Sequence, residues 1–566
     1  MKYLIPIEFS NLFRTEKKEQ PGFYLKTLDK SFLKLVSMQF IAEQDMTAKA
    51  FFQKYCNQES IAQLGNLNEN KKELLDYLNS EELYVINTIN SLKFYETINS
   101  IDYIERNTSL SDSEKELLIL RAYLTLNDSS NKKSEEIYNN IPREIDNRCS
   151  WLILMQTLRY HSILHISNLE VFYTQLKKAF LFLKFLQSKY KNLLELFLKE
   201  MHCSSINEYI NRFISLVLPS MQMSINNKRL EITIPDDHKF KEDRLFFEKL
   251  GHTDIEEDID FRELRSEPLL RLDKNTYLPI LPIFLIEQIY KGIYFRVSQI
   301  NKKHKIIKSD LKSLIGSEFT EGVLLKKVIE SIFDKKYKKI SGNLMTQYAK
   351  ENQAIVDYYI RNGNKIFLFE LKDYLLSSKI ITSTDFPTIY EELRKKFYSN
   401  EKKSLKGVTQ LAESCIDILS ENIGWDTNYK SKRVSIYPIL IVTDNVFTVP
   451  GLNKIMNGWF FEYLKEKVPE KLTQINPLIV ISIDTLLCYN DYFNRNLRNL
   501  DKIFKNYTNR FDPPNYFKNK KVNLKNPNEI LEEVEKSIDF YIKKQEKVDW
   551  QKVINTFLKQ EKIINI

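Results

Sequence analysis

Two carboxylates and a lysine stand close together near two runs of β-forming residues in the middle of the chain. Asp357 precedes the first run, and Glu370 and Lys372 follow the apolar residues 366–369 of the second. Carboxylate oxygens suit hard cations such as Mg²⁺, so a converging Asp357 and Glu370 could hold one. A lysine beside them could orient a water molecule or offset charge on a phosphate oxygen. Together the three residue types could support metal-assisted phosphate chemistry.

The two runs are predicted to pair as a hairpin, because Asn362-Gly363 lies between them and Asn-Gly is a strong turn signal. With these two residues as the loop, Asp357 lies opposite Leu368. Alternate residues of a strand share a face, so the three charged side chains point to the same side. Asp357 and Glu370 then become diagonal neighbours, with about 7–8 Å between their backbones. The opposite face is predicted to be core and carries Tyr358, Ile360, Phe367, Phe369 and Leu371.

A plainer interpretation of the triplet is the polar outer face of a half-buried strand. Glu-x-Lys occurs four times in this charged sequence, and three of the occurrences have polar surroundings. Only the pair at Glu370 and Lys372 follows an apolar strand with an aspartate on the same face. The triplet alone favours this plain interpretation. The elements around it must decide between a polar strand face and a catalytic site.

Glycine placement divides the 566 residues into regions. Two of the 12 glycines precede residue 251, ten lie between Gly251 and Gly458, and none follows. Tight turns are densest where short strands alternate with helices, so the middle is predicted to be α/β between helical flanks. The predicted parts are a helical region over 1–230, a connecting subdomain over 231–310, an α/β domain over 311–490 and a helical tail over 491–566.

The segments Val356-Asp357 and Glu370-Leu371-Lys372 resemble the two sequence motifs of the PD-(D/E)xK nuclease superfamily. The resemblance covers about residues 311–485. It implies a restriction-endonuclease-like core within an α+β or α/β chain. In that core a helix precedes a three-stranded meander, and another helix and a further strand follow.

The resemblance extends to the helices on either side of the hairpin. Residues 315–321 open an amphipathic helix similar to the first family helix, which often carries a glutamate. Thr320 stands where that glutamate is expected, so Glu321 is favoured as the third acid and Glu318 is the alternative. The helix that begins at residues 406–411 resembles the one after the catalytic strands, which implies a secondary contact by Gln410.

The resemblance implies metal-dependent hydrolysis of phosphodiester bonds. Asp357 and Glu370 would hold Mg²⁺ or Mn²⁺, with the Leu371 carbonyl as a further ligand. Lys372 would position the attacking water. Glu321 would support a second cation or orient Lys372.

Binding of nucleic acid requires cations that neutralise phosphates. The net charge of +9 permits such a partner without requiring it. A basic cluster near the predicted site is the candidate surface, although lysine runs more often form solvated helix faces. Its members are Lys395, Lys396, Lys402, Lys403 and Lys406.

Other chemistries find little support in the sequence. Neither of the phosphate-binding motifs GxxxxGK[ST] and GxGxxG occurs, the nucleophile motif GxSxG is also absent, and the five cysteines form no CxxC pair. His161 and His165 are spaced for one helix face, but a glutamate does not follow His161, so ordinary packing is favoured. The N-terminal residues do not resemble a signal peptide and no long apolar run occurs, so a cytoplasmic protein is expected.

The leading hypothesis is a nuclease acting on DNA, with an architecture similar to nucleases of antiviral defence or DNA processing. The helical N-terminal region would then bind a protein partner, a second copy or nucleic acid. Two alternatives remain open. One is a catalytically inactive binding or assembly protein that retains the fold, and the other is a nuclease directed at RNA, since the sequence does not distinguish the two substrates.

Overall fold

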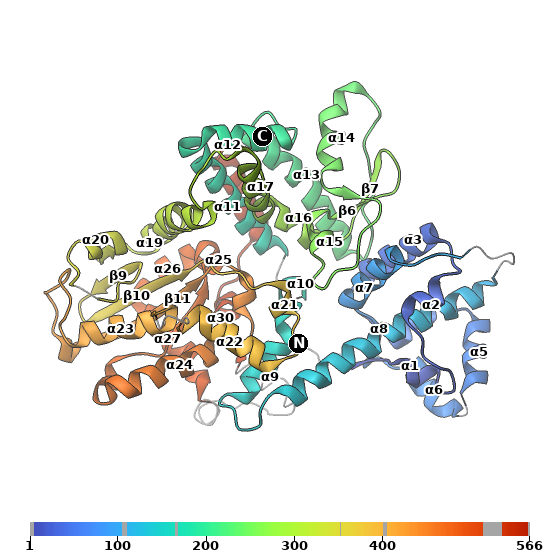
Figure 1. Cartoon of the computed structure of the whole chain (residues 1–566), viewed down its shortest axis with the longest axis horizontal. Helices are drawn as coiled ribbons and strands as arrows, with labels where there is room; N and C mark the ends of the chain where they lie inside the picture. The colour runs from blue at the N-terminus through green and yellow to red at the C-terminus, as the bar shows by residue number, and fades with distance from the viewer. Residues whose placement is uncertain are drawn as a thin grey trace. The chain divides into compact units, whose positions relative to one another are not determined.

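The computed structural model describes residues 5–68, 70–104, 110–164, 168–350, 353–399, 404–512 and 535–563. The chain is a mixed α+β protein in which helices outnumber strands (Figure 1). It forms two compact units, and each unit draws on separate stretches of the sequence. The sheet unit contains residues 137–174 and 307–556, and the helical unit contains residues 2–136, 175–306 and 557–566. This interleaved division is more complex than the linear order of domains that the sequence predicts.

A five-stranded mixed sheet forms the centre of the sheet unit. The strand order is β12-β11-β10-β9-β8, with β8, β9 and β10 antiparallel and β10, β11 and β12 parallel. The carboxyl ends of the three parallel strands therefore meet at one edge of the sheet. The strands are β8 (Lys338–Ser341), β9 (Tyr358–Asn362), β10 (Lys365–Lys372), β11 (Ser435–Val442) and β12 (Ile479–Ser482).

Helices cover both faces of this sheet. On one face, α22, α23 and α24 share a core with Ile366, Leu368 and Leu440. On the other, Phe367 packs against Phe333, Tyr437 and the α27 residue Phe504. The principal helices are α9 (Arg148–Leu158), α10 (His161–Leu164), α18 (Leu311–Leu314), η3 (Ile315–Leu325), α19 (Lys326–Ile332), α20 (Gly342–Thr346), α21 (Ser378–Ile381), α22 (Phe386–Phe397), α23 (Gly407–Leu419), α24 (Leu452–Lys467), α25 (Ile483–Cys488), α26 (Asn490–Arg495), α27 (Leu500–Thr508) and α30 (Ile538–Gln545), and the short ones are η4 (Ser431–Arg433), η5 (Asn445–Thr448), η6 (Pro469–Gln474), η7 (Leu497–Asn499) and η8 (Asn509–Phe511).

The predicted hairpin forms between β9 and β10, but its predicted register is wrong by two residues. Lys365 pairs with Asn362, so the turn residues are Gly363 and Asn364. Gly363 has a φ of +59°, and a glycine adopts this left-handed conformation without a steric penalty. The shift is even, so the predicted division of residues between the two faces is preserved.

Burial of both faces corrects a second expectation. The face with the acids was expected to be the polar side of the hairpin, yet Tyr359, Ile366 and Leu368 on it belong to the core. Parallel strands covered by helices on both sides typically read as continuous apolar runs. The acids therefore lie under helices and not on an open sheet surface.

Pro438 lies within β11 and does not interrupt the strand. Pro438 pairs with Leu368 of β10. The ladder with β12 begins only at Ile439, with an isolated bridge at Ile436 before it. Pro438 thus lies where the strand lacks a regular partner on that side, and the missing N–H is tolerated.

The helical unit has its own apolar core, built in part by Phe40, Phe94 and Tyr123. Two small sheets accompany its helices, in the orders β1-β3-β2 and β4-β7-β6-β5. Its strands are β1 (Ile5–Pro6), β2 (Met46–Thr47), β3 (Leu83–Ile86), β4 (Ile232–Thr233), β5 (Gly251–His252), β6 (Leu269–Arg271) and β7 (Thr276–Pro279). Its helices are α1 (Phe9–Leu12), α2 (Pro21–Leu25), α3 (Lys30–Glu43), α4 (Ala48–Tyr55), α5 (Gln58–Leu67), α6 (Lys71–Leu78), α7 (Thr88–Asn99), α12 (Lys191–Glu200), α13 (Ile206–Ile225), η1 (His238–Phe240), α14 (Lys241–Glu248), α15 (Arg262–Ser266), α16 (Pro282–Glu287), η2 (Gln288–Gly292) and α17 (Ile293–His304).

Three further helices contribute residues to both units: α8 (Asp112–Asn140), α11 (Asn168–Lys189) and α31 (Trp550–Gln560). Within the described parts of the chain, no helix combines the length and the apolar character that crossing a bilayer requires.

Candidate active site

The predicted acids meet where β9 begins and β10 ends. Continuing the ladder one residue past its last pair places Asp357 opposite Glu370, closer than the predicted diagonal arrangement. The Leu371 N–H donates a hydrogen bond of 2.6 Å to Asp357 Oδ2. The Lys372 ammonium lies 2.5 Å from Glu370 Oε1. All three predicted side chains therefore gather in one small region.

Helix α23 holds Lys372 in place. Lys372 Nζ donates to Gln410 Oε1 at 3.2 Å, and Gln410 Nε2 donates to the Ile355 carbonyl at 2.6 Å. The glutamine therefore links the lysine to the segment that precedes Asp357. Gly407, the first residue of α23, lies against the aliphatic stem of Lys372. These contacts place the predicted secondary residue Gln410 in the site.

Glu321 approaches from a π-helical segment, η3. Thr320 is buried, and its hydroxyl donates to the Ile315 carbonyl five residues earlier. The wider turn of a π-helix changes which side chains face the sheet, and such segments are frequent at functional sites. Glu321, which the sequence favoured over Glu318, keeps part of its side chain in solvent and interacts electrostatically with Asp357 and Lys372.

Asp373 is a neighbour that the sequence analysis missed. Thr443, just after β11, donates a hydrogen bond of 2.6 Å to Asp373 Oδ1. The Thr320 hydroxyl oxygen, whose proton is directed at the Ile315 carbonyl, also lies 3.5 Å from Asp373 Oδ2. Asp373 thereby joins the π-helical segment to the ends of β10 and β11. Its position directly after Lys372 at a strand end was the available signal.

Gly342, at the start of α20, forms a backbone hydrogen bond with Asp357. Its N–H donates to the Asp357 carbonyl at 2.7 Å. A Cβ at this position would lie 3.0 Å from the Val356 carbonyl oxygen. The close approach of α20 to the acid-bearing segment therefore depends on a residue without a side chain.

Three carboxyls share one ammonium in this site, so their protonation is coupled. Burial, and then the charge of Asp357, raises the pKa of Glu370 to about 8. Partial burial and the charge of Asp357 raise the pKa of Glu321 to about 7. Burial also raises the pKa of Asp357. Burial opposes the charge on Lys372, but Glu370 outweighs it and raises the pKa of the lysine. The group therefore favours additional positive charge.

The donor set fits a hard divalent cation. Glu370 is 1% exposed, and its Oε2 has no hydrogen-bond partner among the residues that the structure describes. Asp357 and Glu370 supply the oxygen ligands that Mg²⁺ prefers. No three His, Cys, Asp or Glu side chains of the described residues converge closely enough to hold a metal ion by themselves. A cation here would therefore depend on two carboxylates, a backbone carbonyl and water.

The basic cluster is only partly described. Lys395 is exposed at the end of α22, and Lys396 Nζ lies 3.2 Å from Glu392 Oε1 of the preceding turn. Lys406 caps α23, where its N–H donates to Thr409 Oγ1 at 2.9 Å. The predicted contacts Lys402 and Lys403 lie outside the described residues.

Comparisons with known proteins add no relative. No family model, curated protein or solved structure matches the chain. The geometry of the site therefore carries the functional argument.

Gly407→Ala tests how closely α23 packs on the lysine. A Cβ at this position would lie 2.9 Å from Leu440 Cδ1 and 3.4 Å from Lys372 Cγ. We expect a loss of about 1–3 kcal/mol of unfolding free energy, because overpacking forces neighbours to move. Urea unfolding measures this loss of stability. The control Gly65→Ala places a Cβ on helix α5, where no atom beyond the adjoining turn of the helix lies within 4 Å of it. Equal stability changes in the two variants would contradict the close packing of α23 on Lys372.

Proposed function

We propose that the protein is a metal-dependent nuclease that hydrolyses phosphodiester bonds, with DNA as the favoured substrate. One observation carries the proposal. Asp357 and Glu370 lie opposite each other at the end of β10, with Lys372 on one oxygen of Glu370 and no hydrogen-bond partner for the other oxygen among the described residues. A buried carboxylate oxygen without a donor is costly unless a ligand completes it.

The order of the elements also supports the proposal. The helical segment of η3 and α19 precedes three antiparallel strands, with the short helix α20 between β8 and β9, and α21, α22, α23 and β11 follow them. This order agrees with the helix, meander, helix and strand of the PD-(D/E)xK nucleases that the motifs resemble. We therefore propose a restriction-endonuclease-like core for the sheet unit.

Asp357, Glu370 and the Leu371 carbonyl would hold Mg²⁺ or Mn²⁺. When bound, such a cation lowers the pKa of water and offsets negative charge on the phosphate. Lys372 is oriented by Gln410 and would position the attacking water. Glu321 would orient Lys372 from the opposite side or support a second cation.

The Lys372 ammonium has a further role before substrate binds. It lies on Glu370 and partly neutralises the acids. Without the positive charge of Lys372, the three carboxylates would repel an approaching phosphate. Lysine therefore makes the acidic site compatible with an anionic substrate, and the nearby Lys395, Lys396 and Lys406 would neutralise flanking phosphates.

Cleavage assays test the proposal directly. The full-length protein is incubated with plasmid, linear and single-stranded DNA and with RNA, in Mg²⁺, in Mn²⁺ and in EDTA. We expect metal-dependent cleavage that is lost in Glu370→Gln, which keeps the side-chain shape and removes the charge. Cleavage of RNA alone would redirect the proposal to RNA. Equal activity of the two proteins, or none on any substrate, would contradict it, and the second result would favour a binding or assembly protein.

A further inference from the structure

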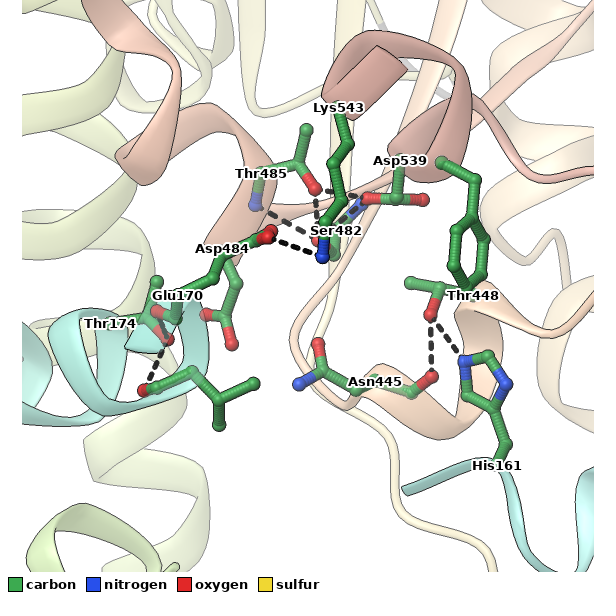
Figure 2. Close-up of a pocket in the computed structure, with 12 residues that line it drawn as sticks. His161, Glu170, Thr174, Asn445, Thr448, Ser482, Asp484, Thr485, Asp539 and Lys543 are labelled. Carbon is green, nitrogen blue, oxygen red and sulfur yellow. Dashed lines mark hydrogen bonds and ion pairs between the residues drawn. The ribbon is translucent and has the colours of Figure 1, made fainter. Parts of the chain in front are cut away.

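A second polar cavity lies at the edge where β11 and β12 end. It encloses about 50 Å³ and is formed by α10, α11, η5, α25 and α30 of the sheet unit (Figure 2). Crevices at the carboxyl ends of parallel strands are common ligand sites in α/β proteins. Nothing in the proposed nuclease reaction uses the residues of this cavity.

Acidic groups outnumber basic ones around the cavity. Glu170, Asp484 and Asp539 contribute three carboxyls, and Lys543 contributes one ammonium (Figure 2). Lys543 Nζ lies 3.0 Å from Glu170 Oε2 and balances that charge. The remaining excess is negative.

Asp539 presents an acceptor oxygen that the described residues leave without a donor. Its Oδ1 accepts hydrogen bonds from the Ser482 N–H at 3.0 Å, from the Ser482 hydroxyl at 2.7 Å and from the Thr485 hydroxyl. Its Oδ2 is buried and has no hydrogen-bond partner among the described residues. Three donors therefore fix the carboxyl group, and one oxygen stays available to a ligand.

The wall near Asp539 adds further polar groups. His161 Nε2 lies 2.9 Å from the Thr448 hydroxyl, so the histidine, for which the sequence favoured ordinary packing, is part of a polar wall. Burial raises the pKa of Glu170, and the charge of Asp539 adds to this effect. Burial raises the pKa of Asp539 as well. A cationic ligand would relieve both penalties.

Size and charge together limit the ligand. The excess of carboxyls disfavours phosphate groups. The volume is far below the roughly 300–1,000 Å³ of pockets that enclose drug-sized ligands, so a nucleotide does not fit. A protonated primary amine is compact and offers three N–H donors.

We propose that this cavity binds the protonated primary amine of a small ligand, with Asp539 as the main acceptor. Glu170 sits across the cavity and provides the second carboxyl. The site is separate from the acids of β9 and β10, and its function does not depend on the proposed nuclease activity.

Calorimetric titration of the full-length protein tests the proposal. The probes are methylammonium, putrescine as a free diamine, and Nα-acetyl-lysinamide as a lysine side chain. Tetramethylammonium has the same charge without N–H donors, and Mg²⁺ is the metal control. Asp539→Asn and Glu170→Gln alter the cavity. The exposed α24 residue Glu462 provides the matched control Glu462→Gln.

We expect saturable binding of at least one primary amine, weakened about tenfold or more in Asp539→Asn, because a charge-assisted hydrogen bond is lost. Glu462→Gln should bind as the wild type does, and tetramethylammonium should not bind. Tighter binding of putrescine would identify a free diamine as the natural ligand. Tighter binding of Nα-acetyl-lysinamide would identify a lysine side chain. If Asp539→Asn fails to fold, Glu170→Gln carries the same comparison. Absence of amine binding, binding that survives in the cavity variants, or a response to Mg²⁺ alone would overturn the proposal.

Discussion

Lys372→Ala is expected to lower the rate of metal-dependent phosphodiester cleavage by about 10²–10³-fold, the usual cost of removing one group that stabilises transition-state charge. The ammonium contacts both Glu370 and Gln410. Its loss leaves three acids without a neutralising cation and the attacking water without a positioning donor. Single-turnover cleavage at saturating protein measures the effect on the chemical step.

Lys365→Ala is the matched control for this variant. Lys365 is the same residue type on the same strand, but it lies at the opposite end of β10, where its Nζ is 2.8 Å from Asp501 Oδ1. We expect Lys365→Ala to cleave at a rate close to that of the wild type. Equal losses in the two variants would show that a general change in charge, and not the position of Lys372, determines activity.

Asp426→Ala is expected to lower the free energy of unfolding by about 3–5 kcal/mol, the cost of removing the buried partner of the largely buried Arg361. Asp426 is 1% exposed and follows α23. Its carboxylate contacts Arg361 Nε at 2.6 Å, Lys338 Nζ at 2.9 Å and the Tyr359 hydroxyl at 2.9 Å. One side chain thus joins this loop to both β8 and β9. Urea unfolding measures the loss, and a cost below about 1 kcal/mol, typical of surface pairs, would contradict the role.

The stability of the protein at low pH should also depend on the contacts of Asp426. Burial acts to raise the pKa of Asp426, but the bonds from Arg361, Lys338 and Tyr359 lower it from 3.8 to about 2. Because folding lowers the pKa of Asp426, its contribution to the free energy of unfolding is complete above the pKa of the unfolded state. This contribution is lost as the pH falls from 3.8 to 2. Asp426→Asn should therefore lose less stability than the wild type over that interval. Parallel acid dependence of the two proteins would contradict the assignment.

The hairpin illustrates how far the sequence predicts this site. The Asn-Gly pair locates the turn, and the two-residue period of a strand assigns each side chain to a face. The turn begins one residue later than predicted because Gly363 takes the left-handed conformation as the first turn residue. Register depends on this detail, but face assignment survives any even shift, so the grouping of Asp357 with Glu370 was predictable.

Other features depend on contacts that no local pattern contains. The π-helical turn at Thr320 has an ordinary amphipathic sequence, so the side-chain directions of Thr320 and Glu321 follow from packing on Asp373 and not from periodicity. The cavity around Asp539 combines segments more than 300 residues apart, such as Glu170 and Lys543. Burial of the acid face likewise follows from the docking of α23.

Binding of Mn²⁺ shows whether Asp357 and Glu370 together hold one divalent cation. Electron paramagnetic resonance counts free Mn²⁺ during titration of the wild type, Asp357→Asn, Glu370→Gln and the exposed-site control Glu462→Gln. We predict that the wild type and Glu462→Gln each bind Mn²⁺ at a site that is absent from both active-site variants. Unchanged Mn²⁺ binding in Asp357→Asn and Glu370→Gln would contradict it.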